Sequence, residues 1–120
     1  MTRKLDPTLD ILDPVPGYES LQLVLKLAYE QAAQGKGKER HAGGRVFDNQ
    51  PIMTIPRTLN GIAGLGGLAY QVSKKTTEAV NMAARSQVDA AQREFLGAIN
   101  YLAAAYLYAE SLKEKAEPTP

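Results

Sequence analysis

The segment from Gly35 to Ile52, GKGKERHAGGRVFDNQPI, concentrates residue types that can hold an anion. Between Lys36 and Arg45 it carries four cationic side chains against the single acid Glu39. Glycines let the backbone turn sharply and approach a ligand, and arginine offers a planar fork of N–H donors that matches phosphate oxygens. The segment therefore predicts binding of a phosphate-bearing nucleotide. The predicted contacts are Lys36, Lys38, Arg40, His41 and Arg45.

Other kinds of site fit the segment less well. A Walker loop needs GxxxxGK followed by Ser or Thr after a strand, and a dinucleotide fingerprint also needs a preceding strand, whereas a helix is expected here. The single histidine, His41, lacks the further histidines or carboxylate cluster of a metal site and a recognisable nucleophile partner. We predict no catalytic residue, no metal and no cofactor. The competing interpretation is a solvated loop held against the core at Phe47.

Length and composition limit the possible classes of protein. A chain of 120 residues fits one domain, and a domain of this size buries about two thirds of its unfolded surface. The sequence has no cysteine, which excludes disulfides, thiolate metal sites and cysteine nucleophiles. A net charge of +1 gives no overall attraction to nucleic acid or anionic lipid, so binding to either is not expected.

The N-terminal sequence MTRKLDPTLDILDP has a basic start but no apolar core of a signal peptide. No later stretch reaches the roughly 18 consecutive apolar residues of a membrane span. We therefore expect a cytoplasmic protein with no membrane attachment.

The spacing of apolar residues predicts an all-α fold, a small bundle of about four helices. The expected helices cover about residues 16–35, a short helix broken at Pro56 within 51–62, and longer helices over about 68–84 and 87–115. We expect one domain over residues 1–120, with an extended arm over 1–14 and a frayed tail over 116–120. In the first helix, the face expected to be buried contains Leu21, Val24, Leu25, Ala28 and Ala32.

Two stretches between the expected helices allow alternatives. The glycine-rich residues 61–67 predict a flexible hinge, in which the glycines either permit close helix packing or present N–H groups to a phosphate. Ser86 and Asp89 have the spacing of a capping box, which favours a new helix starting at Ser86. The alternative is one continuous helix through this point. Lys74 and Lys75 are expected to be solvated.

The last helix is apolar on nearly all sides, which is typical of a helix central to a core or shared between subunits. We therefore favour a homo-oligomer. Asn100 interrupts the apolar surface, and a buried amide needs hydrogen-bond partners. It either fixes the register of packing or forms part of a site wall with Tyr101.

Three blocks of the sequence resemble small phage- and prophage-encoded proteins: GKGKERHA, the tripeptide QPI at residues 50–52, and EFLGAINYLAA over residues 94–104. The resemblance implies that the blocks meet at one site, where Lys38, Glu39, Arg40 and His41 face Asn100 and Tyr101. A phage origin shifts the expected function towards nucleotide metabolism or anti-defence. The overall plan is similar to that of the phage cyclic-nucleotide sponges that inhibit CBASS signalling, because these are also small helical oligomers with a basic pocket.

Three functions remain open from the sequence. The first is non-catalytic binding of a nucleotide or cyclic nucleotide by the predicted contacts together with Asn100 and Tyr101. The second is a helical nucleotide pyrophosphohydrolase, although Glu94, Glu78 and Asp89 each lack the acidic neighbour that would hold magnesium. The third is an interaction module that docks through an apolar helix.

Overall fold

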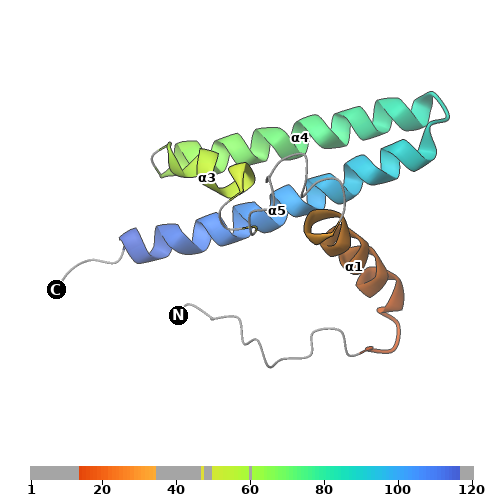
Figure 1. Cartoon of the computed structure of the whole chain (residues 1–120), viewed down its shortest axis with the longest axis horizontal. Helices are drawn as coiled ribbons and strands as arrows, with labels where there is room; N and C mark the ends of the chain where they lie inside the picture. Colours follow the sequence, from red (N-terminus) through yellow and green to blue (C-terminus); the bar gives the residue numbers. More distant parts are fainter. Residues whose placement is uncertain (1–13, 35–46, 48–49, 60, 117–120) are drawn as a thin grey trace.

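The computed structural model describes residues 14–34, 47, 50–59 and 61–116, and the side chains up to residue 113. These residues form four helices and no strand, which confirms the all-α prediction (Figure 1). The helices are α1 (Glu19–Ala33), α3 (Pro51–Arg57), α4 (Ile62–Ala84) and α5 (Val88–Ala116). The expected arm, apart from Pro14, and residues 117–120 of the expected tail lie outside the described residues.

Helices α4 and α5 form a long antiparallel hairpin (Figure 1). The turn ends α4 with a Schellman arrangement, in which Ser86 N donates to Ala83 O at 3.0 Å and Gln87 N donates to Met82 O at 2.8 Å. Ser86 has a φ of +64°, the left-handed conformation that this arrangement requires. The chain therefore breaks into two helices here. The prediction that a helix starts at Ser86 was wrong, because Ser86 belongs to the end of α4 and α5 begins at Val88.

Small side chains let the two long helices approach closely. Ala79 on α4 and Ala91, Ala98 and Ala104 on α5 are buried. A cluster of buried residues joins the hairpin to α3 and contains Met53, Leu68, Ala104 and Tyr108. The core of the described chain therefore lies along the hairpin, and α3 closes one side of it.

The prediction of a flexible hinge over residues 61–67 was wrong. Gly61 has a φ of +55°, and the chain is helical from Ile62 onwards. Gly64 is buried inside α4, where an added Cβ would lie 2.5 Å from Pro56 O and would collide with the Tyr108 ring. The glycine is needed for close packing, which was one of the two roles considered for this stretch.

Helix α3 begins at Pro51, a favourable first position for proline. It continues through Pro56, which is buried in its last turn, and ends at Arg57. The expected short helix in this region is confirmed, and its break comes just after Pro56.

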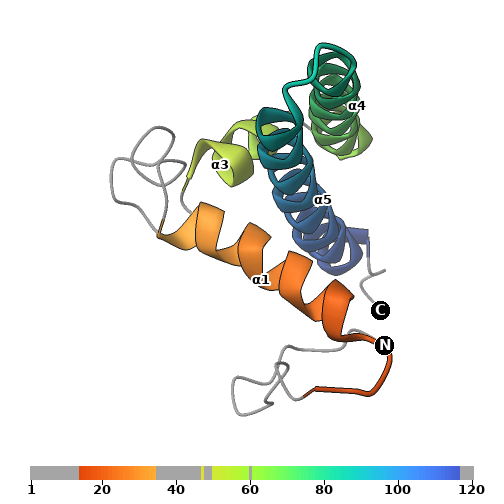
Figure 2. The ribbon, with the colours of Figure 1, turned by 90° about the vertical axis from the view of Figure 1, so that its right-hand side faces the viewer.

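Helix α1 crosses α5, and its N-terminal part slopes away from the hairpin (Figures 1 and 2). Ala28 is buried at the crossing, as expected. Leu21, Val24 and Leu25 are 40 to 54 % exposed, so their predicted burial was wrong. The reason is geometric, because two crossed helices touch over a short length and one buried face cannot be covered from end to end. Of the helices described, none is long and apolar enough to cross a membrane.

Candidate binding site

A cavity of about 970 Å³ lies among α1, α3, α4 and α5. This volume is at the upper end of the range for small-molecule sites. Its apolar lining comes mainly from α3 and α4, and includes Ile52, Ile55, Pro56, Leu59 and Leu68. Its polar lining comes mainly from α1, α4 and α5, and includes Gln31, Gln71, Lys75, Arg93, Glu94, Asn100 and Tyr101. The cavity therefore has one apolar side and one polar side.

Two of the predicted ligand contacts, Asn100 and Tyr101, line this cavity. The other five, Lys36, Lys38, Arg40, His41 and Arg45, lie outside the described residues. The described residues on either side of that segment also line the cavity: Gln31 and Ala32 before it, and Phe47 and Gln50 after it. The structure thus brings Asn100 and Tyr101 to the same cavity as the two ends of the described chain that border the basic segment.

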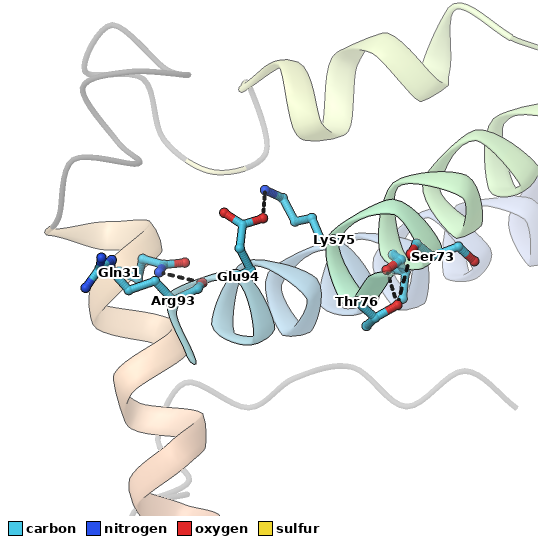
Figure 3. Close-up of polar contacts among 7 residues, drawn as sticks. Gln31, Ser73, Lys75, Thr76, Arg93 and Glu94 are labelled. Atoms are coloured by element: carbon cyan, nitrogen blue, oxygen red, sulfur yellow. Dashed lines mark hydrogen bonds and ion pairs between the residues drawn. The ribbon is translucent and has the colours of Figure 1, made fainter. Parts of the chain in front are cut away.

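Asn100 has a structural role as well as its place in the lining. Its Nδ2 donates to Ala28 O at 3.0 Å, which ties the middle of α5 to α1. A second bond of the same kind runs in the opposite direction, from Gln31 Nε2 to Arg93 O at 3.1 Å (Figure 3). The two bonds fix how α1 crosses α5. Asn100 therefore makes a hydrogen bond between two helices, which is one of the two roles considered for it, and it also lines the cavity.

Lys75 and Glu94 form the charged centre of the polar side. Figure 3 shows their side chains meeting between α4 and α5, with Nζ 3.5 Å from Oε2. About a quarter of each side chain is exposed. The Lys75 ammonium also lies 5.7 Å from the centre of the Tyr101 ring, within the range of a cation–π interaction. Lys75 is therefore held in place, and the prediction that it is a solvated lysine was wrong.

One carboxylate oxygen of Glu94 makes no hydrogen bond to the described residues. Its Oε2 is inaccessible to solvent and has no hydrogen-bond partner among the described residues. The 3.5 Å contact with Lys75 is an ion pair, and its geometry is not that of a hydrogen bond. A buried acceptor without a hydrogen bond is costly, and the ion pair with Lys75 offsets part of this cost.

Tyr101 is uncharged over a wider pH range than an exposed tyrosine. Burial raises its pKa above 10.0, and the positive charge of Lys74 opposes this with a smaller effect. The phenol therefore remains a neutral hydrogen-bonding group at physiological pH. It adds no negative charge that would repel an anion.

The charges of the described lining are uneven. Lys75 and Arg93 are cationic and Glu94 is anionic. A phosphate would be repelled by Glu94 and attracted by the two cations, so it would have to lie away from Glu94. Hydroxyl or amino groups of the same ligand would suit the Glu94 acceptor and the amide side chains.

Lys75, Arg93 and Glu94 were missed as site residues by sequence reasoning. The pairing register of α4 and α5 would have shown that two of them, Lys75 and Glu94, lie close together. Residues equally distant from the turn at Ser86 face each other across α4 and α5, as Gly64 does with Tyr108 and Lys75 with Gly97. In this register Glu94 lies within one helical turn of the position opposite Lys75.

Comparisons with protein-family models, curated proteins and solved structures find no significant match.

Proposed function

We propose that the protein binds a nucleotide-type phosphate ligand without transforming it. The observation that supports this most is the position of Asn100 and Tyr101 in one cavity with the described residues that border the basic segment. The sequence predicts an anion-binding composition for that segment, through Lys36, Lys38, Arg40, His41 and Arg45. The proposed ligand extends from the cavity lined by Asn100 and Tyr101 to the basic segment.

The chemistry of the described lining is compatible with a nucleoside beside the phosphate. The apolar side of the cavity would cover a base or sugar, and amide side chains such as Gln71 offer both donors and acceptors. The partly exposed Glu94 carboxylate would accept from a sugar hydroxyl or an exocyclic amine. The phosphate would be held by Arg93 and by the cations predicted in the basic segment.

The resemblance to small phage proteins extends the proposal to a biological role. A binding protein that holds a cyclic nucleotide without hydrolysing it would lower the free concentration of an immune signal in the host cytoplasm. We therefore propose an anti-defence sponge as the role of this ligand binding, with the chain acting as a homo-oligomer.

Isothermal titration calorimetry against a panel of mono-, di- and cyclic nucleotides tests the proposal. We expect saturable binding of at least one of them. Arg40→Ala and Arg93→Ala should each weaken that binding by about ten- to a hundredfold, because each removes a charge-assisted hydrogen bond. The matched control is Arg85→Ala, which removes an exposed cation at the hairpin turn that does not line the cavity. No binding across the panel, or unchanged affinity in both arginine variants, would contradict the proposal.

Recovery of the ligand separates binding from catalysis. After incubation with magnesium and heat denaturation, the bound nucleotide should be recovered intact by mass spectrometry. Release of pyrophosphate from nucleoside triphosphates would instead favour the pyrophosphohydrolase alternative. No group of three His, Asp or Glu side chains suited to a metal occurs in the described part of the chain, so that alternative gains no support from the described residues.

A further inference from the structure

The surface of α1 is apolar and exposed around most of the helix. Four of its six polar side chains, Glu19, Gln22, Lys26 and Glu30, follow one stripe, and Ser20 and Gln31 lie outside it. The large apolar side chains on the remaining circumference are 40 to 66 % exposed. They are Tyr18 at its N-terminal boundary, Leu21, Leu23, Val24, Leu25, Leu27 and Tyr29. A helix of this composition is typically buried on more than one side.

The rest of the described chain covers only the crossing point. Ala28 is the buried residue of α1, and the two hydrogen bonds to α5 involve Ala28 and Gln31. The N-terminal part of α1 slopes away from the hairpin (Figure 1), and the described helices leave Leu21, Val24 and Leu25 largely uncovered.

The size of this surface matches a protein interface. Helical spacing puts Leu23 and Leu27 roughly 160° around the helix from Leu21 and Leu25, so one partner can cover only one of these two sides. The side with Tyr18, Leu21, Val24, Leu25 and Tyr29 has five large side chains that are each about half exposed. They present on the order of 500 Å² in total, at about 100 Å² for each. The largest apolar patch on a typical monomer is about 300 to 600 Å². One partner's share of a stable interface is about 800 Å². This side of α1 is therefore at the upper end of what a monomer exposes. Its apolar area is close to the apolar part of one partner's share, because somewhat more than half of an interface is apolar.

We infer that two copies of this chain pair through α1, with the same apolar surface on each copy. An apolar surface can pack on its own copy without complementary charges, and such a two-fold interface is the commonest in homo-oligomers. The polar stripe carries Glu19 and Glu30 against Lys26, so it has no strong charge that would select a charged partner. A second copy is also always present in equal amount. The sequence favours a homo-oligomer through the last helix, where Phe95, Leu102 and Tyr106 are also exposed. We place the inferred interface on α1 because more of its large apolar side chains are exposed.

Size-exclusion chromatography with light scattering on the full chain is the first test. We expect a dimer or a multiple of it, whose dissociation on dilution gives the Kd. The double variant Leu21→Glu and Leu25→Glu should raise that Kd at least about a hundredfold, because each substitution buries a charge in place of a leucine. Glutamate is a strong helix former, so α1 itself should persist. The matched control is Val80→Glu, which changes a 61 % exposed residue on α4 and should leave the dimer unchanged.

Cysteine cross-linking tests the interface without the risk of unfolding. The chain has no cysteine, so single variants at Leu21, Leu23, Leu25 or Leu27 report one position each. Under mild oxidation at least one of them should form a covalent dimer at high yield, whereas Val80→Cys should not. The inference would be overturned if the full chain were monomeric at every concentration. This holds regardless of what else covers α1. Dimers that persist in the double variant and fail to cross-link at any α1 position would also overturn it. Ligand binding in the calorimetric panel is a separate measurement, so failure of either proposal leaves the other to its own test.

Discussion

Gly64 on α4 lies against Tyr108 on α5 with no space between them for a methyl group. An added Cβ would lie 2.5 Å from Pro56 O, and it would come too close to the hydroxyl and Cζ of Tyr108. The Tyr108 hydroxyl donates to Gly61 O at 2.9 Å, so the tyrosine ring is held in position by the turn that precedes α4. This contact joins the start of α4, the end of α3 and the C-terminal half of α5.

We predict that Gly64→Ala destabilises the protein by about 1 to 3 kcal/mol, because the methyl group must displace backbone or the hydrogen-bonded tyrosine. The matched control is Gly66→Ala, on the same helix with no atom within 4 Å of the added Cβ. The control should be neutral or stabilising by up to about 1 kcal/mol, since alanine is the better helix former. Urea unfolding of both variants gives the comparison. Equal stability of the two variants would contradict the packing argument.

Asn100→Asp should loosen α1 from α5. The substitution replaces the donor to Ala28 O with a carboxylate that has no proton to give, at a cost of about 1 to 3 kcal/mol. Native-state hydrogen exchange should become faster in α1 than in the α4–α5 hairpin. Asn81→Asp, the same change at an exposed position of α4, is the control. Uniform acceleration in all helices would show that Asn100 supports the whole fold instead of the crossing.

The raised pKa of Tyr101 predicts a loss of stability at alkaline pH. Above pH 10 the unfolded chain loses the Tyr101 proton, whereas burial keeps it on the folded chain. The folded state then binds more protons, so the free energy of unfolding falls as pH rises from about 10 towards the folded pKa. Below pH 10 the contribution of Tyr101 to the free energy of unfolding is fully present.

Tyr101→Phe removes this contribution, so its stability should fall less steeply between pH 10 and the onset of alkaline unfolding. Chemical unfolding at a series of pH values measures the slope. Tyr106→Phe, which removes a hydroxyl from a 61 % exposed residue on the same helix, is the control for the loss of one phenol. Identical slopes in wild type and both variants would show that burial of Tyr101 does not affect stability.

Ser86→Gly should stabilise the protein by about 0.5 to 1 kcal/mol. Ser86 has a φ of +64°, and a left-handed conformation costs a residue with a Cβ about 1 to 2 kcal/mol. Part of this gain is offset by the greater freedom of glycine in the unfolded chain. Ser73→Gly, the same change within α4 at an exposed position, should instead destabilise by up to about 1 kcal/mol. Thermal unfolding of the pair should therefore move the midpoint in opposite directions.

Much of the secondary structure could be predicted from the sequence because the evidence for a helix is local. The last helix was expected over about residues 87–115 and covers Val88–Ala116. Its apolar residues recur at helical spacing without Pro. The same reasoning failed for the glycine-rich residues 61–67, because glycine lowers helix propensity. Glycine is needed at position 64 because the Tyr108 side chain, far along the chain, packs against it.

The candidate site could be predicted only in part. Asn100 and Tyr101 stood out as polar residues on an apolar helix, and both line the cavity. Lys75 did not stand out, because an adjacent pair of lysines on a helix is ordinarily solvated. Its role depends on lying opposite Gly97 and next to Glu94, positions that are set by where the hairpin turns.

The sequence by itself determined most of the helices, but not the start of α4 at Ile62, since periodicity, glycine and proline act within a few residues. The tertiary structure decided which residues meet. The left-handed turn at Ser86 pairs Lys75 with Gly97 and Gly64 with Tyr108, and a different turn position would change every such pair. The crossing of α1 over α5 left Leu21 and Leu25 exposed on a face whose periodicity predicts burial. Helical spacing identifies an apolar face, but only the packing of whole helices determines how much of that face is covered.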